Sequence, residues 1–194
     1  TEVLVHGYEE YGTDLPKHCR GMFAFMIYDT NKDIAFGARD YFGIKPFYYS
    51  VVKGNLVFGS EIKSILEYPG YEKKVNTEAL EEYLTFQYSV LPETFFKGIF
   101  KLPPAHSILF KDGKVDIQRY WEPDYDIDEN ADFDELVDKI DARMAESVET
   151  HMISDVEVGS LLSSGIDSSY IATISKADKT FTVGFDYDKF NETS

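Results

Sequence analysis

The segment VEVGSLLSSGIDSSYIAT, residues 156–173, constrains the possible fold more than any other part of the sequence. Apolar residues between Val156 and Leu162 predict a short buried strand, and the small residues Ser163–Gly165 end it. Apolar residues at helical spacing follow Asp167, so a helix is predicted to begin directly after the turn. The segment therefore places a helix N-terminus at the end of a strand.

The turn has the composition of a phosphate-binding loop. Unpaired backbone N–H groups and the positive end of the helix dipole would face an anion there. Gly165 allows either a close backbone approach or a positive φ. The hydroxyl groups of Ser163, Ser164 and Ser168 add donors, and Asp167 can hold a divalent cation that screens phosphates. The alternative is an ordinary turn into a helix capped by serine and aspartate, which are both favoured there.

Composition argues against several classes of function. The formal net charge of −16 argues against a nucleic-acid partner, whose binding surface needs clustered lysine and arginine. The single cysteine, Cys19, rules out an internal disulfide and fits a reducing cytoplasm. No apolar run reaches membrane-spanning length, so a membrane partner is not expected. Thr1 opens the chain within a predicted helix, and we therefore expect a piece of a longer protein.

The first part of the chain predicts helices and antiparallel hairpins. The first three expected helices span 1–11, 14–18 and 61–68. Alternating patterns predict hairpins over 22–38, 47–60 and 105–120, with turns at 29–33, 53–55 and 112–113. A further helix is expected over Thr77–Phe86, capped by Asn76. Its predicted buried face consists of Leu80, Tyr83 and Leu84.

A second part follows an acidic segment without periodicity, residues 122–131, which we interpret as a linker. Asp132 and Glu135 form a capping-box pattern that opens a long helix. The apolar stripe of this helix consists of Leu136, Ile140, Met144 and Val148. The strand, turn and helix described above come next, and Phe181–Phe185 predicts a second strand. Two strands joined through a helix are expected to pair in parallel.

Four runs in the first part carry a resemblance to a known family. They are Arg20–Phe25 (RGMFAF), Ala38–Tyr49 (ARDYFGIKPFYY), Ser60–Lys63 (SEIK) and Lys101–Pro104 (KLPP). These runs resemble the later part of a class II glutamine amidotransferase domain. The turn Ser163–Ser168 resembles the Ser-Gly-Gly-x-Asp-Ser pyrophosphate loop of ATP pyrophosphatases, with Ser164 where the first glycine is usual. In this order, the two parts resemble the glutamine-hydrolysing asparagine synthetase family.

The resemblance implies an α+β fold followed by an α/β fold. Residues 1–121 would form the later part of an N-terminal-nucleophile-type glutaminase domain, with antiparallel sheets and helices. Residues 122–131 would be the linker. Residues 132–194 would form the first strand, loop, helix and strand of a parallel-sheet ATP pyrophosphatase domain.

The resemblance also implies a reaction. Glutamine is hydrolysed in one domain, and the ammonia amidates aspartate that ATP and Mg²⁺ have adenylated in the other, with release of AMP and pyrophosphate. The implied nucleotide contacts are Leu162, Ser163, Ser164, Gly165, Ile166, Asp167, Ser168, Ser169 and Val183. Asp167 is the implied magnesium ligand. Such an enzyme would be cytoplasmic, with glutamine, aspartate and ATP as its partners, and a homodimer is compatible with it.

Two other classes of function stay open. One is an adenylating ligase of the β-lactam synthetase type, in which the glutaminase half is inert. The other is a non-catalytic fragment that packs against partner domains. A cysteine after the initiator methionine of the complete protein would favour glutamine use, and an intact downstream ATP site would count against a purely interacting role.

No catalytic residue is predicted within the chain, and the chain by itself is expected to be inactive. The nucleophile of the family is an amino-terminal cysteine. Cys19 directly precedes an apolar strand, so it is expected to be a small core residue and not a reactive thiolate. Thr1 could act as a nucleophile through its own amine, but its context is helical. Arg39 and Asp40 are expected to form an ion pair that stabilises a turn. The four histidines lack metal-ligand spacing and are expected to lie on the surface or to support the fold; they are His6, His18, His106 and His151.

Overall fold

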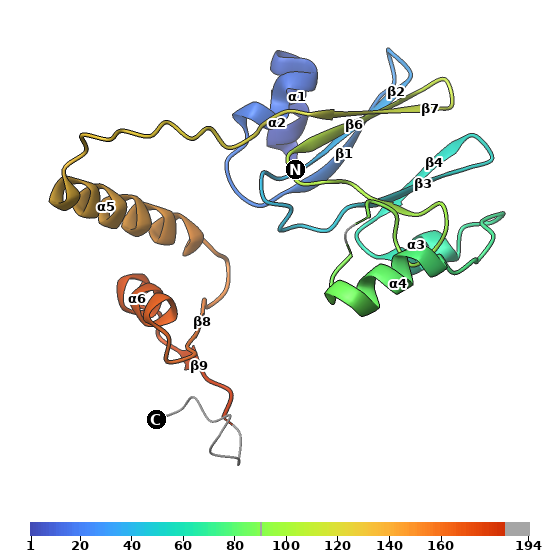
Figure 1. The fold of residues 1–194 in the computed structure, drawn as a ribbon. Helices are drawn as coiled ribbons and strands as arrows, with labels where there is room; N and C mark the ends of the chain where they lie inside the picture. Colours follow the sequence, from blue (N-terminus) through green and yellow to red (C-terminus); the bar gives the residue numbers. More distant parts are fainter. Residues whose placement is uncertain (90, 185–194) are drawn as a thin grey trace. The chain divides into compact units, whose positions relative to one another are not determined.

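The computed structural model describes residues 1–89 and 91–184 of the chain (Figure 1). Contacts divide the chain into two compact units, Thr1–Asp124 and Tyr125–Ser194. Residues 120–132 contain no helix or strand, and the domain boundaries expected at 121 and 132 stay predictions. The last residue of the strand expected over Phe181–Phe185 lies outside the described residues. Among residues 1–89 and 91–184, none of the helices combines the length and the apolar character needed to cross a bilayer.

A four-stranded antiparallel sheet forms the centre of the first unit, in the order β1-β2-β6-β7. Its strands are β1 (Ala24–Asp29), β2 (Ile34–Arg39), β6 (His106–Lys111) and β7 (Lys114–Arg119). The last two strands are joined by Asp112 and Gly113, whose φ values are 50° and 76°. Positive φ at both central residues matches the twist of a two-residue hairpin, so the predicted turn is confirmed.

A three-stranded antiparallel sheet accompanies it, in the order β4-β3-β5. Its strands are β3 (Tyr48–Val52), β4 (Asn55–Gly59) and β5 (Phe100–Lys101). The turn between the first two consists of Lys53 and Gly54, again with positive φ, so it is one residue shorter than expected. The short helix α3 (Ile62–Leu66) follows β4, and α4 (Thr77–Phe86) follows later in the chain.

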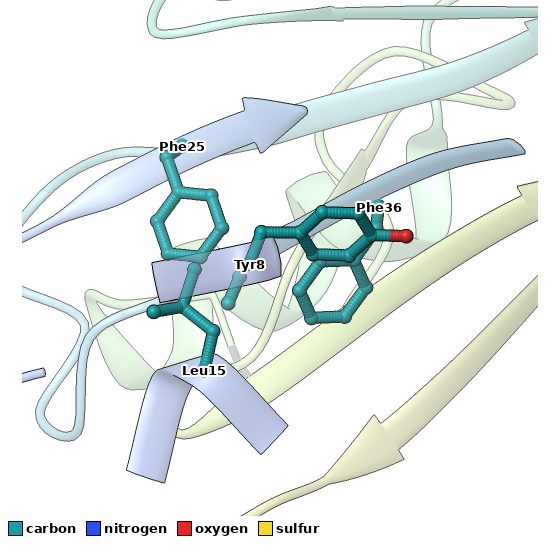
Figure 2. Close-up of a cluster of buried hydrophobic side chains, with 5 residues drawn as sticks. Tyr8, Leu15, Phe25 and Phe36 are labelled. Atoms are coloured by element: carbon teal, nitrogen blue, oxygen red, sulfur yellow. The ribbon is translucent and has the colours of Figure 1, made fainter. Parts of the chain in front are cut away.

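Both faces of the four-stranded sheet are covered. Successive residues of a strand point to opposite sides, so each strand contributes side chains to both faces. On one face, helices α1 (Glu2–Tyr11) and α2 (Leu15–His18) pack against β1 and β2. Figure 2 shows the cluster that joins them, which comprises Tyr8, Leu15, Phe25, Phe36 and Ala38. On the other face, Ala24 and Met26 of β1 pack with a second cluster, formed by Phe47, Tyr49, Leu102 and Ile108. The sheet therefore lies between a helical layer and the second sheet.

Helix α4 has the predicted span and cap but not the predicted buried face. The Asn76 side chain accepts a hydrogen bond from the backbone N–H of Ala79, as expected for an N-cap. Ala79 is 1% exposed, whereas Leu84 is 72% exposed. The helix packs through Ala79, which is its buried residue. The expectation that Leu80, Tyr83 and Leu84 form the buried face was therefore wrong.

The loop after β2 is organised by one buried carboxylate, that of Asp40. Its two oxygens accept four backbone N–H groups: from Phe23 at 3.3 Å, Phe42 at 3.3 Å, Ile44 at 2.9 Å and Lys45 at 2.9 Å. Burial raises the pKa of this carboxyl, but the four hydrogen bonds lower it more, and the net pKa lies below the usual value. Asp40 is therefore held as an anion inside the fold.

Arg39 binds the same loop from the other side, through backbone carbonyl groups. Its Nε donates to the Lys45 carbonyl at 2.7 Å, Nη1 to the Leu102 carbonyl at 2.7 Å, and Nη2 to the Gly43 carbonyl. Arg39 and Asp40 stabilise the turn, but the ion pair expected between them is not found among the described residues 1–89 and 91–184. Each of these two buried side chains instead binds N–H or C=O groups of the loop backbone.

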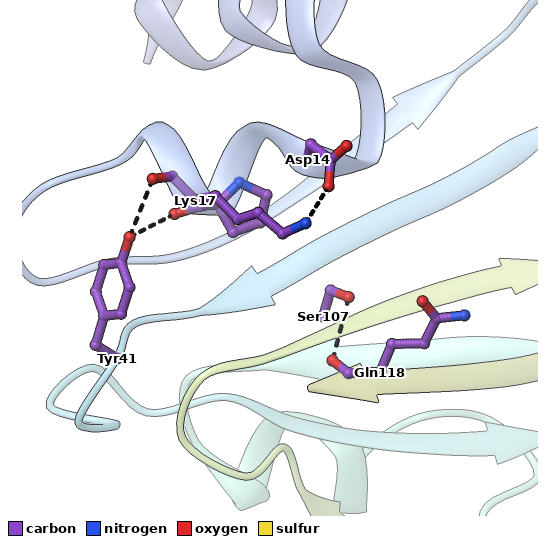
Figure 3. Close-up of polar contacts among 6 residues, drawn as sticks. Asp14, Lys17, Tyr41, Ser107 and Gln118 are labelled. Atoms are coloured by element: carbon purple, nitrogen blue, oxygen red, sulfur yellow. Dashed lines mark hydrogen bonds and ion pairs between the residues drawn. The ribbon is translucent and has the colours of Figure 1, made fainter. Parts of the chain in front are cut away.

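Tyr41 and Tyr120 extend this loop to neighbouring elements. The Tyr41 hydroxyl donates to the Pro16 carbonyl at 3.0 Å and reaches the Lys17 carbonyl at 3.4 Å, which ties the loop to α2 (Figure 3). The Tyr120 hydroxyl donates to the Arg39 carbonyl at 2.7 Å. Burial raises the pKa of the Tyr120 hydroxyl, so it is a donor at every physiological pH.

The second unit begins with the long helix α5 (Phe133–His151). The N-cap of the predicted capping box is confirmed, since the Asp132 carboxylate accepts the N–H groups of Asp134 at 3.0 Å and Glu135 at 3.1 Å. The Glu135 carboxylate lies 3.6 Å from the Lys139 ammonium group instead of completing the box. The predicted stripe is only partly covered: Met144 and Val148 are half-buried, whereas Ile140 is 62% exposed. None of the described residues in this unit is fully buried.

We expect Asp40→Asn to destabilise the first unit by about 3 kcal/mol at pH 7, because an amide removes the charge and turns N–H donors toward backbone N–H groups. The folded-state pKa of Asp40 is lowered, so its contribution is present above the unfolded-state value of about 4 and is lost as pH falls through the folded value. Urea unfolding followed by fluorescence of Trp121, the single tryptophan, measures this at pH 7 and pH 3.

The matched control for this prediction is Asp116→Asn on the exposed hairpin, which should leave the midpoint of unfolding nearly unchanged. Equal midpoints for Asp40→Asn and the wild type at pH 7 would show that the loop does not depend on the carboxylate.

Candidate functional site

The loop singled out in the sequence lies between two short parallel strands, β8 (Ser160–Leu161) and β9 (Thr180–Phe181), and opens helix α6 (Ile166–Ser175). The Ser160 N–H donates to the Lys179 carbonyl and the Leu162 N–H to the Phe181 carbonyl, both at 2.9 Å. The expectation of a buried strand from Val156 onward was wrong: β8 begins at Ser160, and Val156 is 75% exposed. β9 is only two residues long, so the parallel pairing begins at Ser160 and leaves Val156 outside the strand.

Ser168 closes the loop on itself. Its Oγ accepts the Ser163 N–H at 3.2 Å, lies 3.2 Å from the Ser163 Oγ, and donates to the Gly165 carbonyl at 3.1 Å. The next residue begins the regular hydrogen bonding of α6, with the Ser169 N–H on the Gly165 carbonyl at 3.0 Å. The strand end, the turn and the first helical turn are therefore joined through one hydroxyl group.

The left-handed residue of the loop is Ser164, not Gly165. Ser164 has a φ of 60°, whereas Gly165 has an extended conformation with φ −77° and ψ 157°. A residue with a Cβ costs about 1–2 kcal/mol in the left-handed region. The positive φ considered for Gly165 was wrong, which leaves close backbone approach as the reason for a glycine there.

Leu162 and Val183 are the two nucleotide contacts that the resemblance implies at the strand ends. The Thr182 hydroxyl donates to the Leu162 carbonyl at 2.8 Å, so the pairing brings the ends of both strands together beside the loop. Leu162 is half-buried, and Val183 is 73% exposed. The carboxyl ends of parallel strands are where ligands bind in open α/β sheets. Sequence reasoning missed Thr182, which no motif marks.

Asp167 is the second residue of α6 and is exposed, as are Ser163, Ser164, Gly165, Ile166 and Ser169. The N-cap of α6 is Gly165, which has no side chain to cap the helix. The residues that the structure describes contain no group of three or more His, Cys, Asp or Glu side chains that could hold a metal. A single carboxylate fits the way Mg²⁺ binds beside phosphates, through one or two protein ligands and phosphate oxygens.

Helix α6 is positioned by α5. The Tyr170 hydroxyl donates to the Asp141 carboxylate, and this hydrogen bond raises the pKa of Tyr170. Next to it, a cleft of about 280 Å³ is lined largely by apolar side chains of both helices, among them Met144, Val148 and Ile171. The loop therefore begins a helix with a defined support.

The candidate nucleophiles of the first unit do not form a site. Cys19 is half-buried against the Tyr8 cluster, and burial raises the pKa of its thiol, which disfavours the thiolate. Thr1 precedes helix α1 rather than a strand. The four histidines are dispersed: His6 lies near Glu9, His18 stacks on Tyr11, and His106 and His151 bind backbone carbonyl groups.

Comparison with known proteins decides the family. Residues 1–121 match the family model described as a glutamine amidotransferase domain. The chain belongs to this family. Residues 139–194 match a second family model, described as asparagine synthase. The sequence-based resemblance to glutamine-hydrolysing asparagine synthetase is thereby confirmed at the level of family.

Curated relatives match nearly the whole chain. Asparagine synthetase [glutamine-hydrolyzing] 1 of Bacillus subtilis is 37% identical over 197 residues, which cover 99% of this chain and 31% of the relative. Putative asparagine synthetase [glutamine-hydrolyzing] 2 of Methanocaldococcus jannaschii is 35% identical over 204 residues, which cover 100% of this chain and 39% of the relative. The chain thus spans about a third of the length of these relatives.

A solved structure of glutamine phosphoribosylpyrophosphate amidotransferase from B. subtilis, complexed with ADP and GMP, covers 96% of this chain. The alignment covers 40% of that chain, with a TM-score of 0.41 and 15% identity. A similarity of this extent does not bear on the fold of the loop.

We expect both Ser164→Gly and Gly165→Ala to keep the second unit folded. The first relieves the left-handed serine and should leave the melting temperature unchanged or a few degrees higher. The second adds a Cβ that would lie 3.5 Å from the Ser163 Oγ and 3.9 Å from the Ser168 Oγ, which is ordinary contact. Calorimetry of the complete protein measures both, and a fall of more than about 5 °C for Gly165→Ala would contradict the loop geometry.

Proposed function

We propose that the chain is part of an ATP-dependent asparagine synthetase that amidates aspartate with ammonia from glutamine. The observation that carries this proposal is the succession of a glutamine amidotransferase domain and a segment matched by the asparagine synthase family, in which a small-residue loop joins a parallel strand to a helix N-terminus. We place the glutaminase part at 1–121, the linker at 122–131 and the synthetase part at 132–194.

The loop is proposed to hold the leaving pyrophosphate of ATP. Gly165 has no side chain, so a phosphate oxygen can approach the backbone at the start of α6, where N–H groups and the helix dipole favour an anion. Ser163 and Ser164 lie in the same exposed turn, and Ile166, Ser168 and Ser169 form the first helical turn with Asp167. Leu162 and Val183 would contact the nucleotide at the strand ends.

Asp167 is proposed to hold Mg²⁺, which neutralises charge on the phosphate oxygens when bound. An aspartate carboxylate oxygen attacks the α-phosphorus of ATP, and the bond to the bridging oxygen breaks with its electron pair leaving on pyrophosphate. Ammonia then attacks the acyl carbon of the resulting β-aspartyl-AMP, the bond from this carbon to the AMP oxygen breaks, and AMP and a proton are released as asparagine forms. The contribution of this chain is to position and stabilise the leaving group.

A second candidate is an adenylating ligase that uses another carboxylate. Amidase chyE of Penicillium rubens is 34% identical over 175 residues, which cover 88% of this chain and 25% of that protein. The same loop chemistry would serve a different acceptor, since acceptor recognition is not part of the loop. Pyrophosphate release that depends on aspartate, and not on other carboxylic acids, would favour asparagine synthesis.

We expect Asp167→Asn in the complete protein to slow aspartate-dependent release of pyrophosphate from MgATP at least a hundredfold, or about 2.7 kcal/mol of transition-state stabilisation. The melting temperature should stay within a few degrees, because Asp167 is exposed and does not cap the helix. Glutamine hydrolysis, measured separately as glutamate release, should survive because it belongs to the other domain.

Asp178→Asn is the matched control for this substitution, since it removes an exposed carboxylate just beyond α6. It should turn over normally. Normal turnover of Asp167→Asn as well would show that Asp167 has no metal role.

A further inference from the structure

The pairing of β8 with β9 ends in a hydrogen bond from a side chain instead of one from the backbone. Its last backbone rung is the Leu162 N–H on the Phe181 carbonyl, at 2.9 Å. In a regular parallel ladder, the next rung would join the Val183 N–H to the Leu162 carbonyl. Within the described part of the second unit the ladder does not continue to Val183, and the Leu162 carbonyl accepts the Thr182 hydroxyl at 2.8 Å.

We propose that Thr182 is a positioning residue for nucleotide binding. Its hydroxyl closes the pairing of β8 with β9 and thereby keeps the backbone N–H of Val183 available to an acceptor atom of the nucleotide base. This inference rests on the proposed function of the loop. It concerns the strand end and the base, however, and not the pyrophosphate.

The amino end of the pairing is held by other contacts. A Cβ on Gly159 would lie 2.6 Å from a ring carbon of Phe181, so this ring packs directly on the glycine. Just before the two strands, the Lys179 ammonium group forms an ion pair with the Glu157 carboxylate. These contacts lie before or within the strands, so they do not replace a hydrogen bond at the carboxyl end. That bond comes from Thr182.

The hydroxyl changes what the neighbouring N–H can do. Because Thr182 supplies a donor to the Leu162 carbonyl, the Val183 N–H is not needed there. Val183 is 73% exposed, so its surroundings are open to a ligand. An N–H group that is held in place and unused in strand pairing can bind a ligand without first breaking a bond of the fold. Without the hydroxyl, the chain could close the regular rung, and the nucleotide would compete with the Leu162 carbonyl for this N–H.

The test compares two variants of the complete protein. Thr182→Val removes the hydroxyl at nearly constant volume, and Thr182→Ser keeps it. The first readout is inhibition by the two products, AMP and magnesium pyrophosphate, at varied MgATP. We expect Thr182→Val to raise KM for MgATP and the inhibition constant of AMP about fivefold, because both ligands contain the base, and to leave kcat and the inhibition constant of pyrophosphate within about twofold. Thr182→Ser should match the wild type in all four.

The second readout is hydrogen–deuterium exchange at the Val183 amide without any ligand, resolved to single residues. We expect this amide to exchange at least about fivefold more slowly in Thr182→Val than in the wild type, because it then bonds to the Leu162 carbonyl. Thr180→Val is the matched control, since it removes an exposed hydroxyl two residues earlier, away from the strand end. It should change neither the exchange of Val183 nor the inhibition by AMP.

Equal rises in the inhibition constants of AMP and pyrophosphate would overturn the proposal, because they would indicate a distorted loop and not a changed strand end. An unchanged inhibition constant of AMP, or unchanged exchange at Val183 in Thr182→Val, would overturn it as well. If the wild type binds neither product, the proposed function fails, and exchange at Val183 still decides whether Thr182 controls this amide.

Discussion

The first unit depends on the burial of one charged side chain among backbone donors. The loop that leaves β2 carries the chain from the four-stranded sheet to β3 of the second sheet. Phe42 and Ile44 of this loop are exposed, whereas the side chains of Arg39 and Asp40, which bind its backbone, are buried. Asp40 supplies two oxygens as acceptors for N–H groups of the loop, while Arg39 supplies donors for carbonyl groups. Without these two side chains, the loop would lose the hydrogen bonds that fix its backbone.

The loop of the second unit is held by weaker means. Its turn is exposed, so water can satisfy backbone groups that the loop does not pair, and a neutral hydroxyl is enough to close it. An exposed loop also leaves its N–H groups accessible to a ligand. The two loops thus show a physical difference between a connection that builds the fold and one suited to binding.

Local chemistry explains what could be predicted from the sequence. Asp112–Gly113 and the Asn76 cap were predictable because each depends on a few neighbouring residues. The buried row of α4 was not, because two apolar rows satisfy the same helical period and only tertiary packing chooses Ala79 over Leu84. The conformation of Ser164 was missed for a similar reason. Glycine is the expected left-handed residue, and here a hydrogen-bond network lets the neighbouring serine take that role.

The absence of fully buried side chains among the described residues of the second unit has a calorimetric meaning. The heat capacity change of unfolding grows with the apolar surface that folding removes from water. Phe133 and Ile140 of α5 are 76% and 62% exposed, so unfolding changes the hydration of these two side chains only slightly. Within the described part of the chain, the layered first unit therefore contributes most of the heat capacity change of unfolding.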